Sequence, residues 1–286
     1  MKRYRREIII TLLCLFIAGC FVSYFFQFIQ REKGEAKIDS QVLLLPSTKA
    51  LLRIRQADVW SRYMVEKENH LAFFKRYIPS LYLHLFQNIP NKQLLFSFHP
   101  EGVVCYLPAT PHEARIYRSE LAKILNAYPP LKQSKDGIDF YYYADRENRF
   151  AGCFYASGFW VSSYNKQLLE CVQEQLEYTL STISTSQKKE LKDISNLPSI
   201  NKLSGSVSLI WYDGYQWMNT DITLLPDCLS FFSVLPISRS ADSSEMVMAD
   251  TFRLRFSSYL HLPMDSLALQ YSSDEESLYV TVSIKD

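Results

Sequence analysis

Short paired strands followed by a helix occur twice in this sequence, and this repeated pattern limits the fold more than any other feature. In the first copy, residues 93–98 and 103–107 are mainly apolar, and the segment His99–Gly102 between them has the Pro and Gly of a turn. Pro111 then begins a segment whose apolar residues recur every three or four positions. The first copy therefore predicts a β-hairpin followed by a helix.

The second copy has the same order. Residues 138–144 and 150–156 flank a polar turn, residues 159–163 predict a further strand, and Asn165 has the side chain of a helix N-cap. Hairpins that are each followed by one helix are typical of an α+β domain, in which helices cover one face of an antiparallel sheet. We therefore expect residues 31–180 to form antiparallel sheet with helices packed on one face.

The segments on either side of these copies complete the expected order. Residues 51–55 predict a strand, and residues 57–87 predict helix that is broken near Pro79. The polar segment 181–206 predicts a linker or insertion, and residues 207–286 predict a mainly β C-terminal third. This third either continues the first sheet or forms a sheet of its own. Its predicted strands are residues 207–212, 215–225, 228–235, 252–262, 267–271 and 278–284.

A long apolar run lies ahead of this region. Residues 8–28 contain no charged side chain across 21 positions, and four of the first six residues of the chain are basic. As a helix, such a run spans about 31 Å, close to the thickness of the hydrocarbon core of a bilayer. Basic residues favour the cytoplasmic side. Residues 1–30 therefore predict a single-pass transmembrane signal-anchor in the lipid bilayer of a bacterial cell envelope, with the remaining chain as an extracytoplasmic, periplasmic domain.

The segment Leu15–Cys20 supports an alternative. An apolar residue, two small residues and then cysteine resemble the end of a bacterial lipoprotein signal, which implies cleavage before Cys20 and acylation of its thiol. Against this, the apolar character continues through residues 21–29, whereas the chain after a cleaved signal usually turns polar. We favour the uncleaved anchor and keep Cys20 as the candidate lipidation site.

Charge and cysteine pattern exclude several classes of function. Residues 1–30 hold four of the 31 Lys and Arg but only one of the 30 Asp and Glu, so the rest of the chain is slightly acidic. Nucleic-acid binding requires a basic surface and is not expected. The cysteines in the rest of the chain form no Cys-x-x-Cys or Cys/His cluster, so no metal or cofactor is expected, and their disulfide pairing stays open. They are Cys105, Cys153, Cys171 and Cys228.

No segment carries a recognised catalytic motif such as Gly-x-Ser-x-Gly, Ser-x-x-Lys or His-Glu-x-x-His, nor a phosphate-binding glycine loop. His99 and Glu101, with Ser97 two residues earlier, would form a hydrolytic centre only if a remote carboxylate or serine joined them in a cleft. A polar hairpin turn explains these residues better. No catalytic residue is therefore assigned, and the preference is against an enzyme.

Three segments together resemble a known family. They are residues 44–46 with the helices that follow, residues 95–99, and residues 151–169. The pattern resembles an uncharacterised family of Gram-negative, membrane-anchored envelope proteins. This resemblance implies one N-terminal membrane helix and an extracytoplasmic α+β domain, and it carries over no activity and no site residue.

These observations favour a membrane-anchored, non-enzymatic envelope protein that binds another envelope protein or has a structural role. One alternative is an anchored hydrolase that acts on a cell-wall glycan or peptidoglycan. The other is a lipoprotein, acylated at Cys20, that binds a small ligand.

Overall fold

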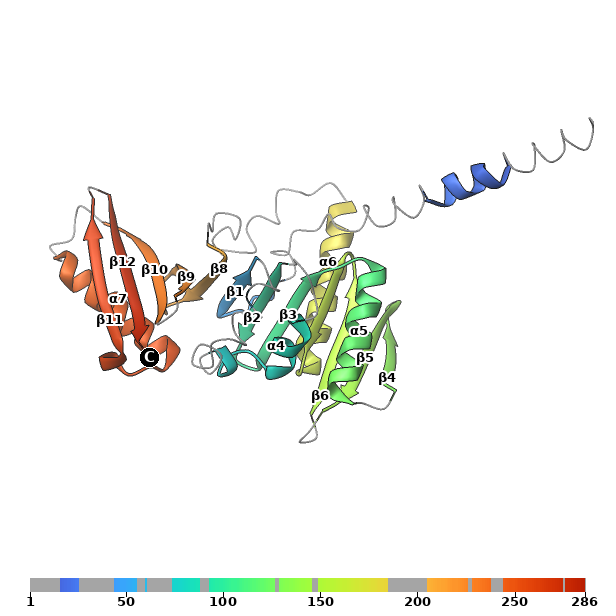
Figure 1. The fold of residues 1–286 in the computed structure, drawn as a ribbon, viewed down its shortest axis with the longest axis horizontal. Coiled ribbons are helices and arrows are strands. Elements are labelled where there is room, and N and C mark those ends of the chain that lie inside the picture. Colours follow the sequence, from blue (N-terminus) through green and yellow to red (C-terminus); the bar gives the residue numbers. More distant parts are fainter. Residues whose placement is uncertain are drawn as a thin grey trace, which may run out of the picture.

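Figure 1 shows the computed structural model of the chain, in which one long antiparallel sheet dominates. The structure describes residues 16–25, 44–55, 60, 74–87, 93–126, 129–145, 149–184, 205–225, 228–237, 244–274 and 276–285. Twelve strands in these residues lie in the order β11-β12-β10-β9-β8-β1-β2-β3-β7-β6-β5-β4. An α+β fold is therefore confirmed.

The first seven strands are β1 (Ala50–Ile54), β2 (Leu94–His99), β3 (Gly102–Pro108), β4 (Leu131–Lys135), β5 (Ile138–Ala144), β6 (Phe150–Ala156) and β7 (Phe159–Ser163). The others are β8 (Val207–Tyr212), β9 (Trp217–Leu224), β10 (Cys228–Pro236), β11 (Leu267–Ser273) and β12 (Ser277–Lys285). The helices are α4 (Ser80–Phe86), α5 (Pro111–Leu125), α6 (Lys166–Ser184), α7 (Glu245–Leu260) and the short 3-10 helix η5 (Met264–Ser266).

Strand β1 joins the two parts of the sheet. Leu52 lies opposite Phe96 of β2 on one side and opposite Leu209 of β8 on the other. The C-terminal strands β8 to β12 therefore continue the sheet that β1 to β7 begin. Most of the predicted linker at residues 181–206 lies outside the described residues.

Helices cover both faces of the sheet, so the prediction of helices on one face was wrong. Successive side chains of a strand point to opposite faces. On β3, Val104 and Tyr106 belong to the apolar cluster that includes Leu169 of α6, whereas Cys105 and Leu107 belong to the cluster of α4, α5 and α7. In Figure 1, α5 and α6 accordingly flank the same strands. The unbroken apolar stretch of β3 reflects burial on both faces.

The predicted strand at residues 252–262 was also wrong, because this segment belongs to helix α7. Ser244 caps the helix by accepting a hydrogen bond from the backbone N–H of Val247. The side chains that α7 buries recur every three or four residues, which is helical spacing. They are Ala249, Phe252, Phe256, Ser257 and Leu260.

The hairpins of the second copy were predicted with the bounds of β5, β6 and β7, but strand β4 was missed. Asp136 and Gly137 join β4 to β5 with φ values of 51° and 80°, and Ser157 and Gly158 join β6 to β7 with 48° and 83°. Two successive positive φ values match the right-handed twist of a two-residue hairpin. The break near Pro79 is confirmed because α4 begins at Ser80, whereas residues 57–59 and 61–73 lie outside the described residues.

The prediction of a transmembrane helix at the N-terminus was wrong. In the part of the chain that the structure describes, no helix has both the length and the apolar character needed to cross a bilayer. Residues 16–25 are helical, which gives about 15 Å at 1.5 Å per residue, about half of a hydrocarbon core. The rest of the apolar run, residues 8–15 and 26–28, lies outside the described residues. Acylation of Cys20 stays a prediction.

The described cysteines are free thiols. Cys105 and Cys153 are completely buried, and this burial raises the pKa of both thiols, that of Cys153 to about 12. Cys171 is exposed and Cys228 is half-buried. The two buried thiols therefore serve as apolar core groups.

An ion pair fastens helix α7 to the turn between β8 and β9. The Asp213 side chain is 1% exposed, and one of its oxygens accepts a hydrogen bond from Arg255 Nη1 at 2.6 Å. The other oxygen accepts from the backbone amides of Tyr215 and Gln216, each at 2.8 Å. Burial raises the pKa of Asp213, but the two amides and Arg255 outweigh it and hold the pKa below its ordinary value.

We expect Asp213→Asn to lower the free energy of unfolding by about 1–2 kcal/mol at pH 7, because charge-assisted hydrogen bonds are lost. A lowered folded-state pKa stabilises the protein fully above the unfolded-state pKa of about 3.9, and this contribution is lost as the pH falls from there through the folded-state pKa. Urea unfolding of both proteins at pH 7 and near pH 3 measures this. If the difference in free energy of unfolding between wild type and variant is as large near pH 3 as at pH 7, the lowered pKa of Asp213 is contradicted.

Candidate functional site

Three hollows meet at one end of the sheet, around the β2–β3 turn and the beginning of α6. The serine pocket, of about 540 Å³, is lined by Ser47, Glu101 and Asn165 among others. The basic groove, of about 770 Å³, shares Glu101 and Asn165 with it. The edge hollow, of about 410 Å³, shares Arg149, Tyr164 and Lys166 with the basic groove. These shared residues make the three hollows neighbours.

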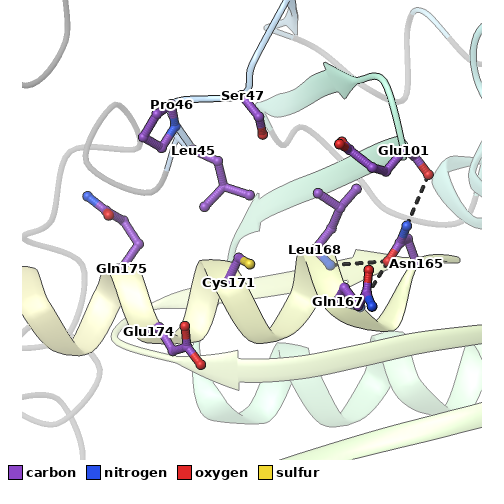
Figure 2. Close-up of a pocket in the computed structure, with 10 residues that line it drawn as sticks. All are labelled: Leu45, Pro46, Ser47, Glu101, Asn165, Gln167, Leu168, Cys171, Glu174 and Gln175. Carbon is purple, nitrogen blue, oxygen red and sulfur yellow. Dashed lines mark hydrogen bonds between the residues drawn. The ribbon is translucent and has the colours of Figure 1, made fainter.

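The Asn165 side chain connects the β2–β3 turn to the first turn of α6, and both segments line these hollows. Its Oδ1 accepts hydrogen bonds from the backbone amides of Gln167 at 2.9 Å and Leu168 at 3.2 Å, which caps α6 as the sequence predicts. Its Nδ2 donates to the backbone carbonyl of Glu101 at 3.1 Å. Figure 2 shows these bonds. The β2–β3 turn is therefore held against the start of the helix.

The basic groove brings four cations together. Lys75 and Arg76 precede the break at Pro79, Arg149 precedes β6, and Lys166 begins α6. Glu101 is the one carboxylate among the described residues that line the groove. Cations that converge on a concave surface attract anions and donate charge-assisted hydrogen bonds to them. The groove therefore suits a negatively charged group.

Aromatic rings hold two of these cations in place. The Arg149 guanidinium lies over the Tyr164 ring, 5.3 Å from its centroid, and 3.8 Å from the carboxylate of Asp145. Tyr164 in turn donates its hydroxyl to Asp145 at 2.7 Å. Lys166 Nζ lies 5.7 Å from the centroid of the Tyr142 ring. Lys166 Nζ also donates to Gln133 Oε1 at 3.1 Å and lies 3.6 Å from Glu170 Oε1, so several contacts orient each of these two cations.

One row of paired residues forms part of the lining of the edge hollow. Leu131 lies opposite Tyr142, Tyr142 opposite Gly152, and Gly152 opposite Ser163, so these four residues cross β4, β5, β6 and β7 in one line. The glycine in the row lets the Tyr142 ring and the Leu169 side chain approach the backbone closely. Leu131 and Phe150, 58% and 52% exposed, add apolar surface beside the cations.

Ser47, which lines the serine pocket, begins a chain of hydrogen-bonded side chains that leads into the protein interior. Ser47 Oγ lies 2.9 Å from His99 Nδ1, and Ser97 Oγ lies 2.7 Å from His99 Nε2. Ser97 donates to the Tyr106 hydroxyl at 3.4 Å. Ser97 and Tyr106 are completely buried and His99 is buried, whereas Ser47 is exposed.

The structure brings Ser97 and His99 together, as the sequence suggested for a hydrolytic centre, and adds the remote Ser47. Glu101 lines the same pocket as Ser47, and its charge raises the pKa of His99 against the larger lowering by burial. The candidate lipidation site Cys20 lies in the helix at residues 16–25 and is exposed. Among the described residues, no cluster of His, Cys, Asp or Glu could hold a metal ion.

Sequence reasoning missed Ser47 and the four cations of the basic groove. Ser47 is 52 residues from His99, so no local spacing connects them. The cations come from three separate segments, each of which has the ordinary composition of a solvated turn or helix start. The only local sequence feature at Ser47 is the Pro that precedes it in the segment Leu45–Thr48. A Pro followed by Ser indicates a turn and gives no sign of a nucleophile.

Comparisons with known proteins give no family for the chain. No protein-family model matches the sequence, and no curated protein matches it. Among solved structures, the chain in "Structure of crystal form I of TP0453" is similar over 87% of this chain and 94% of that chain, with 10% sequence identity and a TM-score of 0.45. A likeness of this degree carries no inference about function.

Proposed function

We propose that the protein binds an acidic glycan, with the acidic group in the basic groove and a sugar ring in the edge hollow. The observation that carries this proposal is the convergence of Lys75, Arg76, Arg149 and Lys166 on one concave surface. The whole chain, by contrast, is nearly neutral, with a formal net charge of +1. The positive charge is therefore a local property of this site.

The edge hollow supports a ligand that has an apolar face as well as a charge. Tyr142, Phe150 and Leu131 line it beside Arg149 and Lys166. Binding sites of this kind combine flat apolar side chains with a few polar groups that fix orientation. The faces of sugar rings carry C–H groups that pack on aromatic rings, and their hydroxyls can bond to polar side chains. A glycan of the cell wall lies outside the cytoplasm, so this function requires export, which stays a prediction.

Titration of the full-length protein with two disaccharides tests the proposal. The acidic one is N-acetylglucosaminyl-N-acetylmuramic acid, and the neutral one is N,N′-diacetylchitobiose, which lacks the lactyl carboxylate. We expect only the acidic disaccharide to bind, with affinity that falls as salt is added. The double variant Arg149→Gln with Lys166→Gln should bind at least about tenfold more weakly, because two charge-assisted hydrogen bonds are lost.

The matched control changes two cations of α5 that do not line the groove. They are Arg115 and Lys123, and both are exposed. Arg115→Gln with Lys123→Gln removes the same charge and should leave the affinity unchanged. Equal binding of both disaccharides, or an equal loss in both double variants, would overturn the proposal.

A further inference from the structure

We infer that Ser47 is a nucleophile that His99 activates, and that this pair hydrolyses a small acyl ester in the serine pocket. A nucleophile and its base are recognised by a hydrogen bond of about 2.6–3.2 Å between them and by a third group that orients the base. Ser47, His99 and Ser97 meet this description at 2.9 and 2.7 Å. This activity goes beyond the binding function proposed above and does not depend on the ligand of the basic groove.

The turn that carries Ser47 is held rigidly. The backbone N–H and the hydroxyl of Thr48 both donate to the carbonyl of Leu45, at 3.0 and 2.6 Å, which closes a tight turn with Pro46 and Ser47 at its centre. Leu45 and Thr48 are buried, and the backbone N–H of Lys49 donates to the carbonyl of Phe98 at 2.8 Å. The Ser47 hydroxyl is thus exposed on a fixed backbone, beside the end of β2.

The inferred reaction uses one tautomer of His99. In this tautomer His99 Nε2–H donates to Ser97 Oγ, and Ser97 donates its hydroxyl hydrogen to Tyr106. A neutral imidazole with its hydrogen on Nε2 has an unprotonated Nδ1. Nδ1 therefore accepts the hydrogen of Ser47 Oγ, which is the direction of proton transfer that a general base requires.

Burial favours the neutral imidazole that this step needs. Burial lowers the pKa of His99, and Glu101 and the backbone of Ser47 raise it by smaller amounts. His99 is therefore ready to accept a proton at neutral pH. Ser97, which is completely buried and holds Nε2, acts as a positioning residue.

The lining of the serine pocket indicates the substrate class. Figure 2 shows Ser47 and Glu101 on one side of the pocket and Gln167, Cys171 and Glu174 of α6 on the other. Two carboxylates would repel an anionic acyl group, whereas Leu45, Pro46 and Leu168 provide apolar contacts. A small uncharged acyl group, such as acetyl, suits these surroundings.

The reaction proceeds in two balanced steps. Ser47 Oγ attacks the ester carbonyl while its proton passes to His99 Nδ1, and the leaving alcohol takes that proton as its C–O bond breaks. Water then attacks the acyl-serine, again giving its proton to Nδ1, and Ser47 regains a proton as the carboxylic acid leaves.

A fluorophosphonate probe and p-nitrophenyl acetate test the inference on the full-length protein. We expect the probe to label Ser47, identified by peptide mass spectrometry, and the ester to be hydrolysed. Ser47→Ala and His99→Gln should each lower kcat/KM by at least about 100-fold. Ser272→Ala, which removes an exposed serine of β11, should change neither result. Ser97→Ala should lower kcat with little change in KM, and Ser97→Thr should restore it.

Circular dichroism shows whether each variant is folded. If a variant unfolds, labelling of the wild-type protein still tests whether Ser47 is a nucleophile, because this experiment needs no substitution. Failure to label Ser47, or hydrolysis that survives Ser47→Ala, overturns the inference. Loss of glycan binding by the variants of the basic groove would leave both results unchanged, so the two proposals fail separately.

Discussion

Replacing Trp211 with Ala is expected to lower the free energy of unfolding by about 3–5 kcal/mol, the range for large aromatic truncations in a core. Trp211 lies on β8, near the middle of the sheet, and is 1% exposed. Its ring centroid lies 4.8 Å from that of Tyr259 and 5.6 Å from that of Phe256, both on α7. Truncation would leave a cavity between the sheet and the helix that covers its C-terminal half.

A second effect adds to the cavity. Trp211 Nε1 donates to Thr220 Oγ1 at 3.1 Å, and Thr220 Oγ1 lies 2.8 Å from Ser233 Oγ. Thr220 is completely buried and Ser233 is 1% exposed. A buried hydroxyl that loses a partner carries a desolvation cost. Trp211→Phe keeps most of the ring volume but removes this N–H, so it should cost about 1–2 kcal/mol and separates the two contributions.

Urea unfolding followed by far-UV circular dichroism measures both variants. The control is Tyr212→Ala, because Tyr212 is the next residue of β8, points to the opposite face and is 38% exposed. It contacts Trp217 with ring centroids 5.6 Å apart, so its loss should cost about 1 kcal/mol or less. Equal losses for Trp211→Ala and Tyr212→Ala would show that α7 does not depend on Trp211.

The hairpins could be predicted because the residues that indicate a strand or a turn lie within the hairpin segments themselves. Residues 138–144, 150–156 and 159–163 were predicted with the bounds of β5, β6 and β7, since apolar stretches there are bounded by turn residues. Strand β4 was missed because its residues, Leu131–Lys135, are an edge sequence that is exposed over most of its length, and it has no apolar alternation.

The sequence of helix α7 is compatible with either a strand or a helix. Phe252, Leu254 and Phe256 alternate as in a strand, whereas Phe252, Phe256 and Leu260 have the spacing of a helix face. Leu254 is 57% exposed in the structure, and the other three are buried. Packing of this face against Trp211 and Phe231 therefore decides between the two, and that contact joins distant parts of the sequence.

The candidate site depends on such distant contacts throughout. His99 was identified from its own turn, but Ser47 reaches it only because β1 pairs with β2 and places the preceding turn beside the end of β2. In the same way, the chain order gives no sign that Arg149 and Lys166 line a groove with Lys75. The fold class could thus be predicted from the sequence, whereas the site required the register of the sheet.

Gly152→Ala is expected to lower the free energy of unfolding by about 1–3 kcal/mol, because overpacking forces neighbouring groups to move. A Cβ atom at this position would lie 2.5 Å from Cδ1 of Leu169 and 2.9 Å from Cε1 of Tyr142. A glycine at this position therefore avoids a clash with both side chains. Leu169 is buried on α6 and Tyr142 lines the edge hollow, so the variant should also weaken binding of the acidic disaccharide.

The matched control is Gly137→Ala. Gly137 has a φ of 80° and no atom within 4 Å of an added Cβ, so its substitution costs only the backbone strain of about 1 kcal/mol and leaves binding unchanged. A double-mutant cycle identifies the contact: Leu169→Ala removes Cδ1, so Gly152→Ala should cost less in that background than in the wild type. If Gly152→Ala costs the same in both backgrounds, contact with Leu169 does not explain its effect, and Tyr142 alone would remain as the crowded neighbour.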